Sequence, residues 1–348
     1  MQALMVTPRV ANSAHLAEIP SPVPEDGWLL VRGVAIGVCG TDREIVAGDY
    51  GTPPPGHAHL VLGHESLGRV EQAPAASGFA VGDLVAGVVR RPDPVPCGAC
   101  AQGEFDMCRN GQYTERGIKN LDGFASQWWT IEPGYAVKVP AALGIAGVLV
   151  EPTSVVAKAW DQIERIGARS WFDPKRVLVT GAGPIGLLAA LLGVQRGLEV
   201  HVLDRATAGV KPEAVQALGA TYHSDPVEQV ATRLNPDIII EATGAAQVVI
   251  DVISHNAPYG IVCLTGVSPS GRLLPLDAGL VNRNIVLDND VVVGSVNAGL
   301  RHYEAAVQAL ALADPAWLAR LLTRQVPLDR FPEALAAQQE DIKVVLTL

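Results

Sequence analysis

The chain has 348 residues, and its 36 acidic against 26 basic residues give a formal net charge of −10. Hydrophobic residues make up 49% of it, which excludes a disordered protein, and the length predicts two or three domains around a large core. This acidic balance, with no basic run longer than Arg90-Arg91, argues against nucleic acid or an anionic membrane as a partner.

The first residues of the sequence show no targeting signal. Residues 1–6 lack both a positive region and a cleavage site, so we expect a cytoplasmic protein. The longest mostly apolar run, residues 183–194, is shorter than the ~18 residues of a membrane-spanning helix. We therefore expect no membrane contact.

Residues 1–155 predict a β-rich region. Short apolar runs alternate there with turn signals that contain proline and glycine, as is typical of strands joined by tight loops. The predicted strands are 28–34, 68–70, 84–89 and 136–139.

The pattern changes at residue 176, where strand-like runs begin to alternate with helical ones. This alternation predicts βαβ units and a parallel sheet. The predicted strands are 177–180, 199–203, 237–240 and 260–264, and the predicted helices are 184–196, 212–218 and 246–255. After about residue 295 we expect helices at 300–312, 315–322 and 331–338, then a strand at 343–346. The apolar stretch 284–294 is either an ordinary internal strand or an edge strand that pairs across a dimer.

A first metal-like constellation occurs in the β-rich half. Cys39, His64 and Glu65 supply a thiolate, an imidazole and a carboxylate, the ligand types suited to Zn²⁺, next to glycines that permit sharp loops. Glu151, between an apolar stretch and a proline, is a further candidate because a buried carboxylate is costly unless it binds a metal or accepts hydrogen bonds. Taken one at a time, these residues have other interpretations: Cys39 as a small core residue, His64 as a core histidine and Glu65 as a surface charge.

Three of the five cysteines form a second cluster. Cys97, Cys100 and Cys108 fall within twelve residues of a loop rich in proline and glycine, which indicates a zinc lobe rather than disulfides. A closed zinc site needs four ligands, and the nearest oxygen donor is Asp93. The alternatives are Glu104, Asp106, or three surface thiols without a metal.

A glycine-rich motif opens the parallel-sheet half. Gly181, Gly183 and Gly186 form GxGxxG directly after a strand and at the start of an apolar helix, which indicates a dinucleotide pyrophosphate site. Asp204 follows at the distance expected for an acid that accepts from the ribose hydroxyls. Its charge favours NAD, while Arg205 offers a cation for NADP.

The order of these motifs resembles one family over essentially the full length. The segments are GVCGTD at 37–42, LGHES at 62–66, the cysteine lobe, GAGPIG at 181–186 and ATG at 242–244. They resemble the medium-chain zinc-dependent alcohol dehydrogenases. Segments 89–92, 114–118, 122–124 and 294–297 look like the glucose dehydrogenase branch of that family.

This resemblance implies an α/β protein with two domains. It implies a GroES-like β-rich catalytic domain at 1–157 with the cysteine lobe near 93–111. It also implies a Rossmann domain with a doubly wound parallel sheet at 158–297, and a return to the catalytic domain at 298–348. Because the family is commonly dimeric or tetrameric, we expect a homodimer or homotetramer.

The resemblance also assigns roles to residues. It makes Cys39, His64 and Glu65 the catalytic zinc set, with Glu151 as a ligand or sugar contact, and Cys97, Cys100, Cys108 and Asp93 the structural zinc set. It makes Thr41 part of the substrate or proton-relay network, and Glu115 and Asn297 sugar-binding groups. The implied cofactor-binding residues are Gly181, Gly183, Pro184, Ile185, Gly186, Asp204, Arg205, Thr243, Thr265, Val296 and Asn297.

The chain departs from the family pattern at three points. Pro94 stands at the first of the four lobe cysteines, and Val89 stands where some members present an asparagine to the sugar. Members that prefer NADP carry Asn-Arg-Arg after the second Rossmann strand, whereas residues 204–206 read Asp-Arg-Ala. This third departure favours NAD over NADP.

The expected activity is oxidation of the C1 hydroxyl of an aldose such as glucose to the aldonolactone, with Zn²⁺ and NAD or NADP. The alternatives are a zinc-dependent polyol, cyclitol or secondary-alcohol dehydrogenase and a zinc-independent reductase of the same superfamily. A protein of another class, a non-catalytic dinucleotide-binding redox sensor, would bind NAD without turnover.

Overall fold

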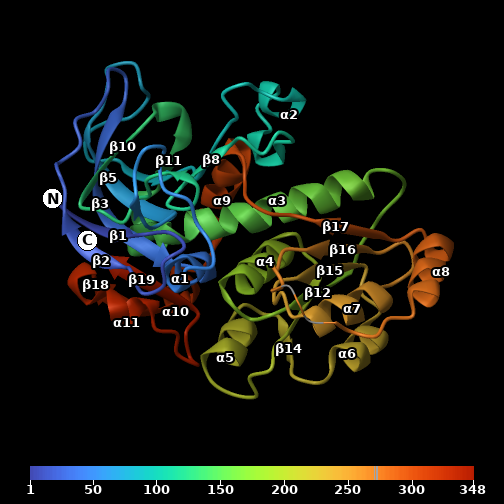
Figure 1. Ribbon diagram of the computed structural model, residues 1–348. Coiled ribbons are helices and arrows are strands. Elements are labelled where there is room, and N and C mark those ends of the chain that lie inside the picture. The colour runs from blue at the N-terminus through green and yellow to red at the C-terminus, as the bar shows by residue number, and fades with distance from the viewer. Residues whose placement is uncertain (270, 272) are drawn as a thin grey trace. The chain divides into compact units, whose positions relative to one another are not determined.

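The computed structural model describes residues 1–269, 271 and 273–348, and Figure 1 shows its ribbon. The chain forms two compact units. The β-rich unit comprises Met1–Ser154 and Asn297–Leu348, and the parallel-sheet unit comprises Val155–Val296. The sequence predicts the two domain boundaries after residues 157 and 297.

A seven-stranded sheet forms the frame of the β-rich unit. Its order is β11-β6-β5-β3-β19-β18, and β10 also pairs with β3. The strands are β3 (Leu29–Val38), β5 (Glu65–Gln72), β6 (Leu84–Gly87), β10 (Trp128–Ile131), β11 (Ala136–Val139), β18 (Leu322–Pro327) and β19 (Lys343–Thr347). The register aligns Gly37 with Glu65 and Val38 with Val344. The end of β3 therefore lies beside the beginnings of both β5 and β19.

Two small sheets and several short helices complete this unit. The sheets are β2-β1-β4 (β1 Gln2–Val6, β2 His15–Glu18, β4 Leu60–Val61) and β7-β8-β9 (β7 Arg90–Arg91, β8 Thr114–Arg116, β9 Asn120–Leu121). The helices are α1 (Gly40–Ala47), α2 (Gly98–Ala101), α9 (Leu300–Leu312), α10 (Pro315–Leu321) and α11 (Phe331–Leu335). The 3₁₀ helices are η1 (Phe105–Met107), η2 (Pro133–Tyr135), η3 (Ala141–Leu149) and η4 (Leu328–Arg330).

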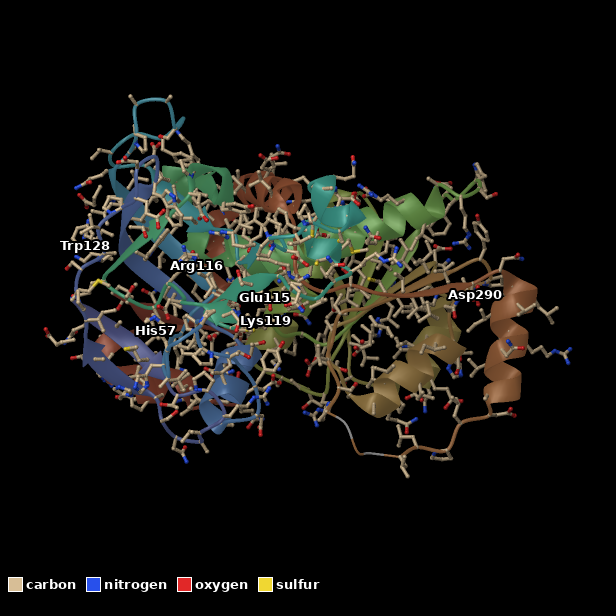
Figure 2. All side chains as sticks on the ribbon, turned by 45° about the horizontal axis from the view of Figure 1, so that its top comes forward. His57, Glu115, Arg116, Lys119, Trp128 and Asp290 are labelled. Carbon is tan, nitrogen blue, oxygen red and sulfur yellow. The ribbon has the colours of Figure 1, made fainter. Side chains whose placement is uncertain are left out.

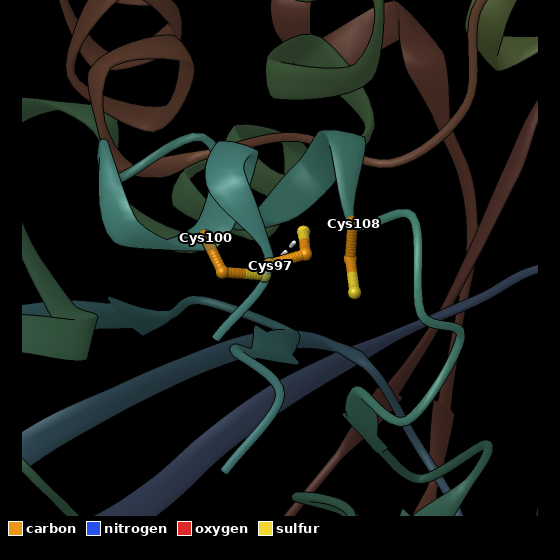
Figure 3. Close-up of side chains that lie close together, drawn as sticks. All are labelled: Cys97, Cys100 and Cys108. Carbon is orange, nitrogen blue, oxygen red and sulfur yellow. Dashed lines mark hydrogen bonds between the residues drawn. The ribbon is translucent and has the colours of Figure 1, made fainter. Parts of the chain in front are cut away.

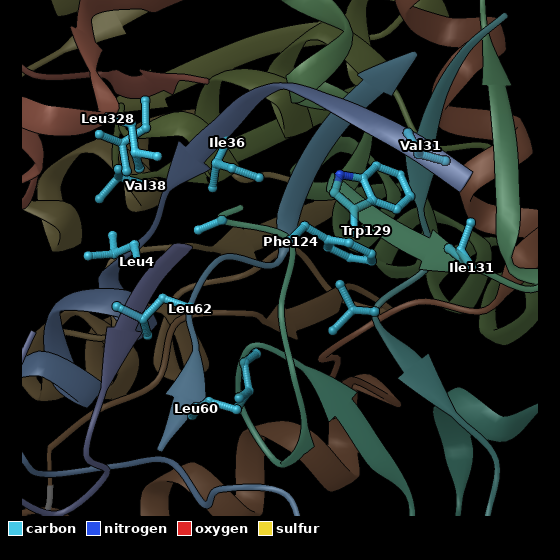
Figure 4. Close-up of a cluster of buried hydrophobic side chains, with 14 of the residues drawn as sticks. Leu4, Val31, Ile36, Val38, Leu60, Leu62, Phe124, Trp129, Ile131 and Leu328 are labelled. Carbon is cyan, nitrogen blue, oxygen red and sulfur yellow. The ribbon is translucent and has the colours of Figure 1, made fainter. Parts of the chain in front are cut away.

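The core of the β-rich unit is a continuous cluster of aliphatic and aromatic side chains (Figure 4). Phe124 and Trp129 meet edge to face with 4.8 Å between ring centroids, and Val31 and Ile36 of β3 belong to the same cluster. Each fully buried side chain of this size contributes roughly 1.5–3 kcal/mol. The central strand that precedes Cys39 is thus anchored by packing.

The parallel-sheet unit holds a six-stranded sheet in the order β14-β13-β12-β15-β16-β17. Each neighbouring pair is parallel, so the predicted Rossmann topology is confirmed. The strands are β12 (Arg176–Thr180), β13 (Glu199–Leu203), β14 (Thr221–His223), β15 (Ile238–Glu241), β16 (Ile261–Leu264) and β17 (Val291–Gly294). The helices are α4 (Pro184–Gln195), α5 (Val210–Ala217), α6 (Val227–Leu234), α7 (Ala246–Ser254) and α8 (Ala278–Asp288).

Two predicted elements differ from the structure, and one long helix was not predicted. The stretch 284–294 is not one strand: α8 runs to Asp288, Asn289 ends it in the left-handed region with φ 58°, and β17 then lies at the edge of the sheet. The helix predicted at 331–338 ends at Leu335. The sequence reading missed helix α3 (Val150–Gly167), because Pro152 suggests a break although proline is tolerated in a first helical turn.

One helical stretch among the described residues, Ala141–Gly167, is long and apolar enough to cross a membrane. Most of its apolar window, 67%, is buried within the protein. We therefore interpret it as a core helix.

Candidate functional site

Cys39, His64 and Glu65 come together where two neighbouring strands meet. Cys39 follows β3 and caps helix α1, while Glu65 begins β5 opposite Gly37. The thiol sulfur, a ring nitrogen of His64 and a carboxylate oxygen of Glu65 all lie within 4.8 Å of one another. These three residues, called the zinc group below, form one constellation, as the sequence predicts.

The zinc group fits the demands of Zn²⁺. Its sulfur, nitrogen and oxygen donors are the ligand types of catalytic zinc sites, which use three protein ligands and keep a fourth position open. Cys39 is partly exposed, whereas His64 and Glu65 are buried. A buried carboxylate and imidazole placed this close to a thiol would hold a cation well.

Asp42 is a partner of the zinc group that the sequence reading left without a role. One carboxylate oxygen lies 3.3 Å from Nδ1 of His64, and the other accepts the backbone N–H of Cys39 at 2.8 Å. Burial works against both charges, yet their attraction raises the pKa of His64 well above its ordinary value and lowers the pKa of Asp42. Asp42 orients the imidazole, as carboxylate partners of metal-binding histidines do. The sequence signal that could have indicated this role was the position of Asp42 three residues after Cys39.

Glu151 lies in the first turn of α3 and is buried near the zinc group. Burial raises its pKa to about 7 against the opposing effect of His64, and the negative charge of Glu65 adds to the rise. Its carboxylate is not among the three mutually close ligand atoms. Its role as a zinc ligand or sugar contact therefore stays a prediction.

Lys343 is the second partner that sequence reasoning missed. Its Nζ lies 2.6 and 2.7 Å from the two carboxylate oxygens of Glu65, and it donates to the carbonyl of Val38 at 3.3 Å. Burial alone would lower the pKa of Lys343, but the charge of Glu65 raises it above its ordinary value. No local sequence pattern connects two residues that are 278 positions apart.

The structure brings the predicted sugar-binding groups Glu115 and Asn297 together. Asn297 donates from Nδ2 to Oε1 of Glu115 at 2.7 Å, and Arg90 donates to the same oxygen at 2.8 and 3.1 Å. The Arg90 guanidinium lies 3.7 Å from the centre of the Tyr113 ring. Figure 2 labels Glu115 among the side chains of this unit. The carboxylate is thus a fixed hydrogen-bond acceptor, and the sequence reading missed its partner Arg90.

Thr41 and Val89 complete the description of the predicted substrate residues. Thr41 lies in α1, two positions after Cys39, and is half-buried. Val89 is buried, and its backbone N–H donates to the hydroxyl of Tyr303 at 3.2 Å. The position where some family members present an asparagine is therefore apolar here.

The cysteine lobe gathers its three thiols, as Figure 3 shows. The sulfurs of Cys97, Cys100 and Cys108 lie within 4.8 Å of one another, and those of Cys97 and Cys100 are 3.7 Å apart. The backbone N–H of Arg109 donates to Cys97 at 3.4 Å and, with other backbone donors, lowers its pKa to about 6. The thiolate favoured at Cys97 suits a structural zinc, whereas burial raises the pKa of Cys100.

No carboxylate of the described residues joins the three mutually close thiols. Asp93 is buried beside them, since its backbone donates to Cys100. Oδ1 of Asp93 accepts from the backbone of Val95, while Oδ2 has no hydrogen-bond partner among the residues that the structure describes. Glu104, one alternative, pairs with Arg301 at 3.0 Å.

The glycine-rich turn has the geometry of a dinucleotide site. Gly181 has φ +95°, and a Cβ on Gly186 would collide with the carbonyl oxygen of Gly181. Pro184 and Ile185 begin α4, whose N-terminus carries unpaired N–H groups that attract phosphate. Only glycine fits the first and last positions of this turn.

Asp204 lies directly against the glycine-rich turn. Its carboxylate accepts the backbone N–H groups of Ala182 and Arg205, each at 2.7 Å, and Lys211 lies 3.6 Å away. Burial would raise its pKa, but these donors and Lys211 lower it. Asp204 is therefore a charged acceptor, while the Arg205 side chain is exposed.

The other predicted cofactor residues follow neighbouring strands of the same sheet. Thr243 follows β15 and donates its N–H and hydroxyl to Glu241, and the Thr265 hydroxyl, after β16, donates to the Glu241 carbonyl at 2.7 Å. Val296, two residues after β17, is exposed. Ligands of open α/β sheets bind at these carboxyl ends. The buried Glu241 organises both threonines, a role that the sequence reading missed.

Comparison with known proteins identifies the family. The alcohol dehydrogenase GroES-like domain matches residues 25–141, and the glucose dehydrogenase C-terminus matches residues 144–348. The chain is 38% identical to glucose 1-dehydrogenase of Methanocella arvoryzae, covering 100% of this chain and 99% of that protein. It is 42% identical to glucose 1-dehydrogenase of Thermoproteus tenax, covering 99% of each.

Solved structures agree with this assignment. The glucose dehydrogenase of Haloferax mediterranei in complex with NADP, Zn and gluconolactone has a TM-score of 0.92 and 34% identity, covering 100% of this chain and 99% of that one. Galactitol-1-phosphate dehydrogenase from Escherichia coli, at 23% identity and a TM-score of 0.82, shares the fold. The chain therefore belongs to the glucose dehydrogenase branch of the medium-chain zinc-dependent alcohol dehydrogenase family, with a GroES-like domain and a Rossmann domain.

Proposed function

We propose that this protein is a zinc-dependent, NAD(P)-linked dehydrogenase that oxidises the C1 hydroxyl of an aldose such as glucose to the aldonolactone. The observation that carries the proposal is the mutually close set of Cys39, His64 and Glu65 in a chain that also bears a complete dinucleotide turn. The likeness to a glucose dehydrogenase solved with NADP, Zn and gluconolactone supports the substrate class.

The residues of the β-rich unit would hold and orient the sugar. Zinc, when bound by Cys39, His64 and a carboxylate, supplies a Lewis acid that lowers the pKa of the reacting hydroxyl. Glu115, fixed by Arg90 and Asn297, would accept hydrogen bonds from other hydroxyls of the sugar. Such a site rejects analogues that lack these hydroxyls, because its own polar groups would be left unpaired.

Thr41 and Glu151 are the proposed proton carrier and second carboxylate of the site. The Thr41 hydroxyl lies in α1 next to the zinc group and would pass the substrate proton outward. Glu151, with its raised pKa of about 7, would act as a zinc ligand or a sugar contact. A bound nicotinamide cofactor would supply the redox chemistry by accepting a hydride from the reacting carbon.

We propose NAD as the preferred coenzyme and NADP as the alternative. Asp204 stays charged against the glycine-rich turn, so a ribose hydroxyl would be accepted there and a 2′-phosphate repelled. Arg205, exposed beside it, is the cation that would favour NADP. Asp204→Ala should lower kcat/KM for NAD more than for NADP.

We propose a structural zinc in the cysteine lobe with Asp93 as the fourth ligand. Oδ2 of this buried carboxylate has no hydrogen-bond partner in the described part of the chain and lies beside three mutually close thiols, which supports the assignment. Metal analysis of the purified chain should then give two zinc ions per chain.

The test of the function is steady-state kinetics with NAD and NADP against aldoses, polyols and simple alcohols, with the zinc content of the same sample. We expect turnover with glucose or another aldose at full zinc occupancy. A metal-free sample that reduces NAD with glucose equally well would contradict the proposal. Tight NAD binding without turnover on any substrate would identify a redox sensor instead.

A polyol or cyclitol dehydrogenase is the second candidate. Val89 is buried and apolar where some family members present a polar contact, and the Tyr303 hydroxyl occupies its backbone N–H. Loss of that contact would relax the requirement for a sugar ring. Higher kcat/KM for a polyol than for every aldose tested would favour this candidate.

The proposed assembly is a homodimer or homotetramer in the cytoplasm. Strand β17 is the last strand of the sheet order, and the side chains of Val292 and Val296 are exposed there. An edge strand of this kind offers a surface to a second copy. Light scattering coupled to size-exclusion chromatography would measure the mass of the assembly.

A further inference from the structure

Lys343 is the buried cation nearest to the carboxylate of the zinc group. The side chain is 2% exposed, and its three donors are taken up by the two oxygens of Glu65 and the carbonyl of Val38. A buried lysine is rare unless it is paired, because removal of its charge from water is costly. A buried ion pair is therefore retained at the predicted zinc ligand Glu65.

The Glu65 carboxylate is confined on a second side by β3. A Cβ on Gly37 would collide with Oε2 of Glu65, so the carboxylate occupies the space that a larger residue would fill. Gly37 is also the register partner of Glu65. The carboxylate thus lies between the backbone of β3 and the ammonium group of Lys343, with one oxygen close to the Cys39 and His64 donors.

We propose that Lys343 is a positioning residue for the zinc centre: it fixes the Glu65 carboxylate in the orientation that faces the Cys39 and His64 ligand atoms. This inference rests on the proposed function, which places zinc at this group. Without Lys343 the carboxylate is free to rotate, and the backbone of β3 confines it on one side only. Outer partners of metal ligands typically contribute 10- to 100-fold to metal affinity.

Two other roles for Lys343 predict different results. A counter-charge alone would oppose Zn²⁺, so removing it would tighten zinc binding. A purely structural ion pair would lower stability and leave zinc affinity unchanged. Positioning alone predicts weaker zinc binding that depends on the presence of Glu65.

The test is a double-mutant cycle on zinc affinity. Zinc is titrated against a chromophoric chelator into four metal-depleted full-length proteins: wild type, Lys343→Met, Glu65→Gln and the double variant. The Cys39→Ser variant identifies which binding phase belongs to this site. We expect Lys343→Met to weaken this phase by about 10- to 100-fold, and to weaken it no further when Glu65 is already glutamine.

The double variant also guards against misfolding. Lys343→Met leaves Glu65 buried without its partner, whereas the double variant removes both charges and should fold. The inference is overturned if Lys343→Met binds zinc as tightly as the wild type, or more tightly. It is also overturned if the double variant binds zinc more weakly than Glu65→Gln does. If the wild type binds no zinc that depends on Cys39, the proposed function itself fails.

Cobalt substitution gives a measurement that distinguishes positioning from a purely structural role, because a purely structural role of Lys343 would leave the Co²⁺ spectrum unchanged. Co²⁺ bound at this site should show visible bands that shift in Lys343→Met, because the ligand geometry changes. Lys343→Arg keeps the charge and the donors and should restore part of the wild-type spectrum. Identical spectra in wild type and Lys343→Met would contradict the inference.

Discussion

The β-rich unit holds two sets of candidate metal ligands, the zinc group and the cysteine lobe, and different kinds of groups compensate their charges. In the zinc group, His64 and Glu65 are buried on the main sheet, and the partners Asp42 and Lys343 compensate them with full charges. In the cysteine lobe, the thiols lie on a four-residue helix and a loop, and backbone N–H groups are the main compensation for Cys97. The first set is thus held in place by charged side chains of neighbouring elements.

The difference fits the two proposed roles, which are a catalytic zinc in the zinc group and a structural zinc in the cysteine lobe. Ligands fixed by charged partners on a packed sheet should depend little on a bound metal for their geometry. The lobe has little regular structure, with α2 of four residues and η1 of three, so a bound metal would supply much of its folding energy. Mutations in the two sets should therefore affect activity and stability differently.

The largest expected effect is on activity in the zinc group. His64→Ala should lower kcat/KM by at least about 10³-fold, because the metal that stabilises developing charge is lost. Kinetics and metal analysis of the same sample check this. The exposed His57, labelled in Figure 2, gives the matched control, and His57→Ala should leave both values unchanged. Wild-type turnover in His64→Ala would show that the group is not catalytic.

The next effect concerns the stability of the lobe. Cys100→Ser should lower Tm by about 5 °C or more and remove one zinc ion, while kcat changes by less than about twofold. Calorimetry, metal analysis and kinetics measure the three quantities. A large loss of kcat at unchanged Tm would reverse the contrast between the two sets.

A smaller effect tests the fourth ligand of the lobe. Asp93→Asn should weaken the lobe zinc by about tenfold, since a neutral amide is a poorer ligand than a carboxylate. Glu104→Gln is the matched control, because Glu104 pairs with Arg301 instead. Competition with a chelator measures both. A loss confined to Glu104→Gln would move the ligand to that residue.

The smallest effect is chemical and needs no mutation. In metal-depleted protein, Cys97 with a pKa of about 6 should react with iodoacetamide at pH 7, and at pH 5 about tenfold more slowly as its thiolate is protonated. Cys263 is buried, and burial raises its pKa to about 12, so it should stay unmodified at both. Peptide mass spectrometry follows the two thiols. Equal labelling of Cys97 at pH 7 and pH 5, or labelling of Cys263 to the same extent as Cys97, would contradict this prediction.

The parallel-sheet unit was the more predictable half of the fold. Its glycine-rich turn occupies six consecutive residues, and Asp204 follows at the expected spacing, so local pattern carries the information. The three-residue zinc group was predictable for the same reason, because its donors lie in two short motifs in which Cys39 and His64 each adjoin a glycine. The helix α3 was missed where Pro152 outweighed a helical pattern.

The partners of the site were less accessible to sequence reasoning. Lys343 pairs with Glu65 across 278 positions, and Arg90 pairs with Glu115 across 25. Such contacts are set by strand register, which no single segment encodes. Asp42 stands inside a recognised motif, yet its contact with His64 depends on the turn between β4 and β5.

The pairing of β19 with β3 has a consequence for how the protein is made. β3 pairs with β5 along one edge, and on the other edge β10 pairs with residues 29–32 and β19 with residues 35–38. The 35–38 part of this second edge therefore stays open until residues 343–347 arrive. Pairings between such distant segments form slowly, and an open strand edge invites aggregation in the meantime. Because β19 also delivers Lys343, metal uptake should follow the closure of this sheet.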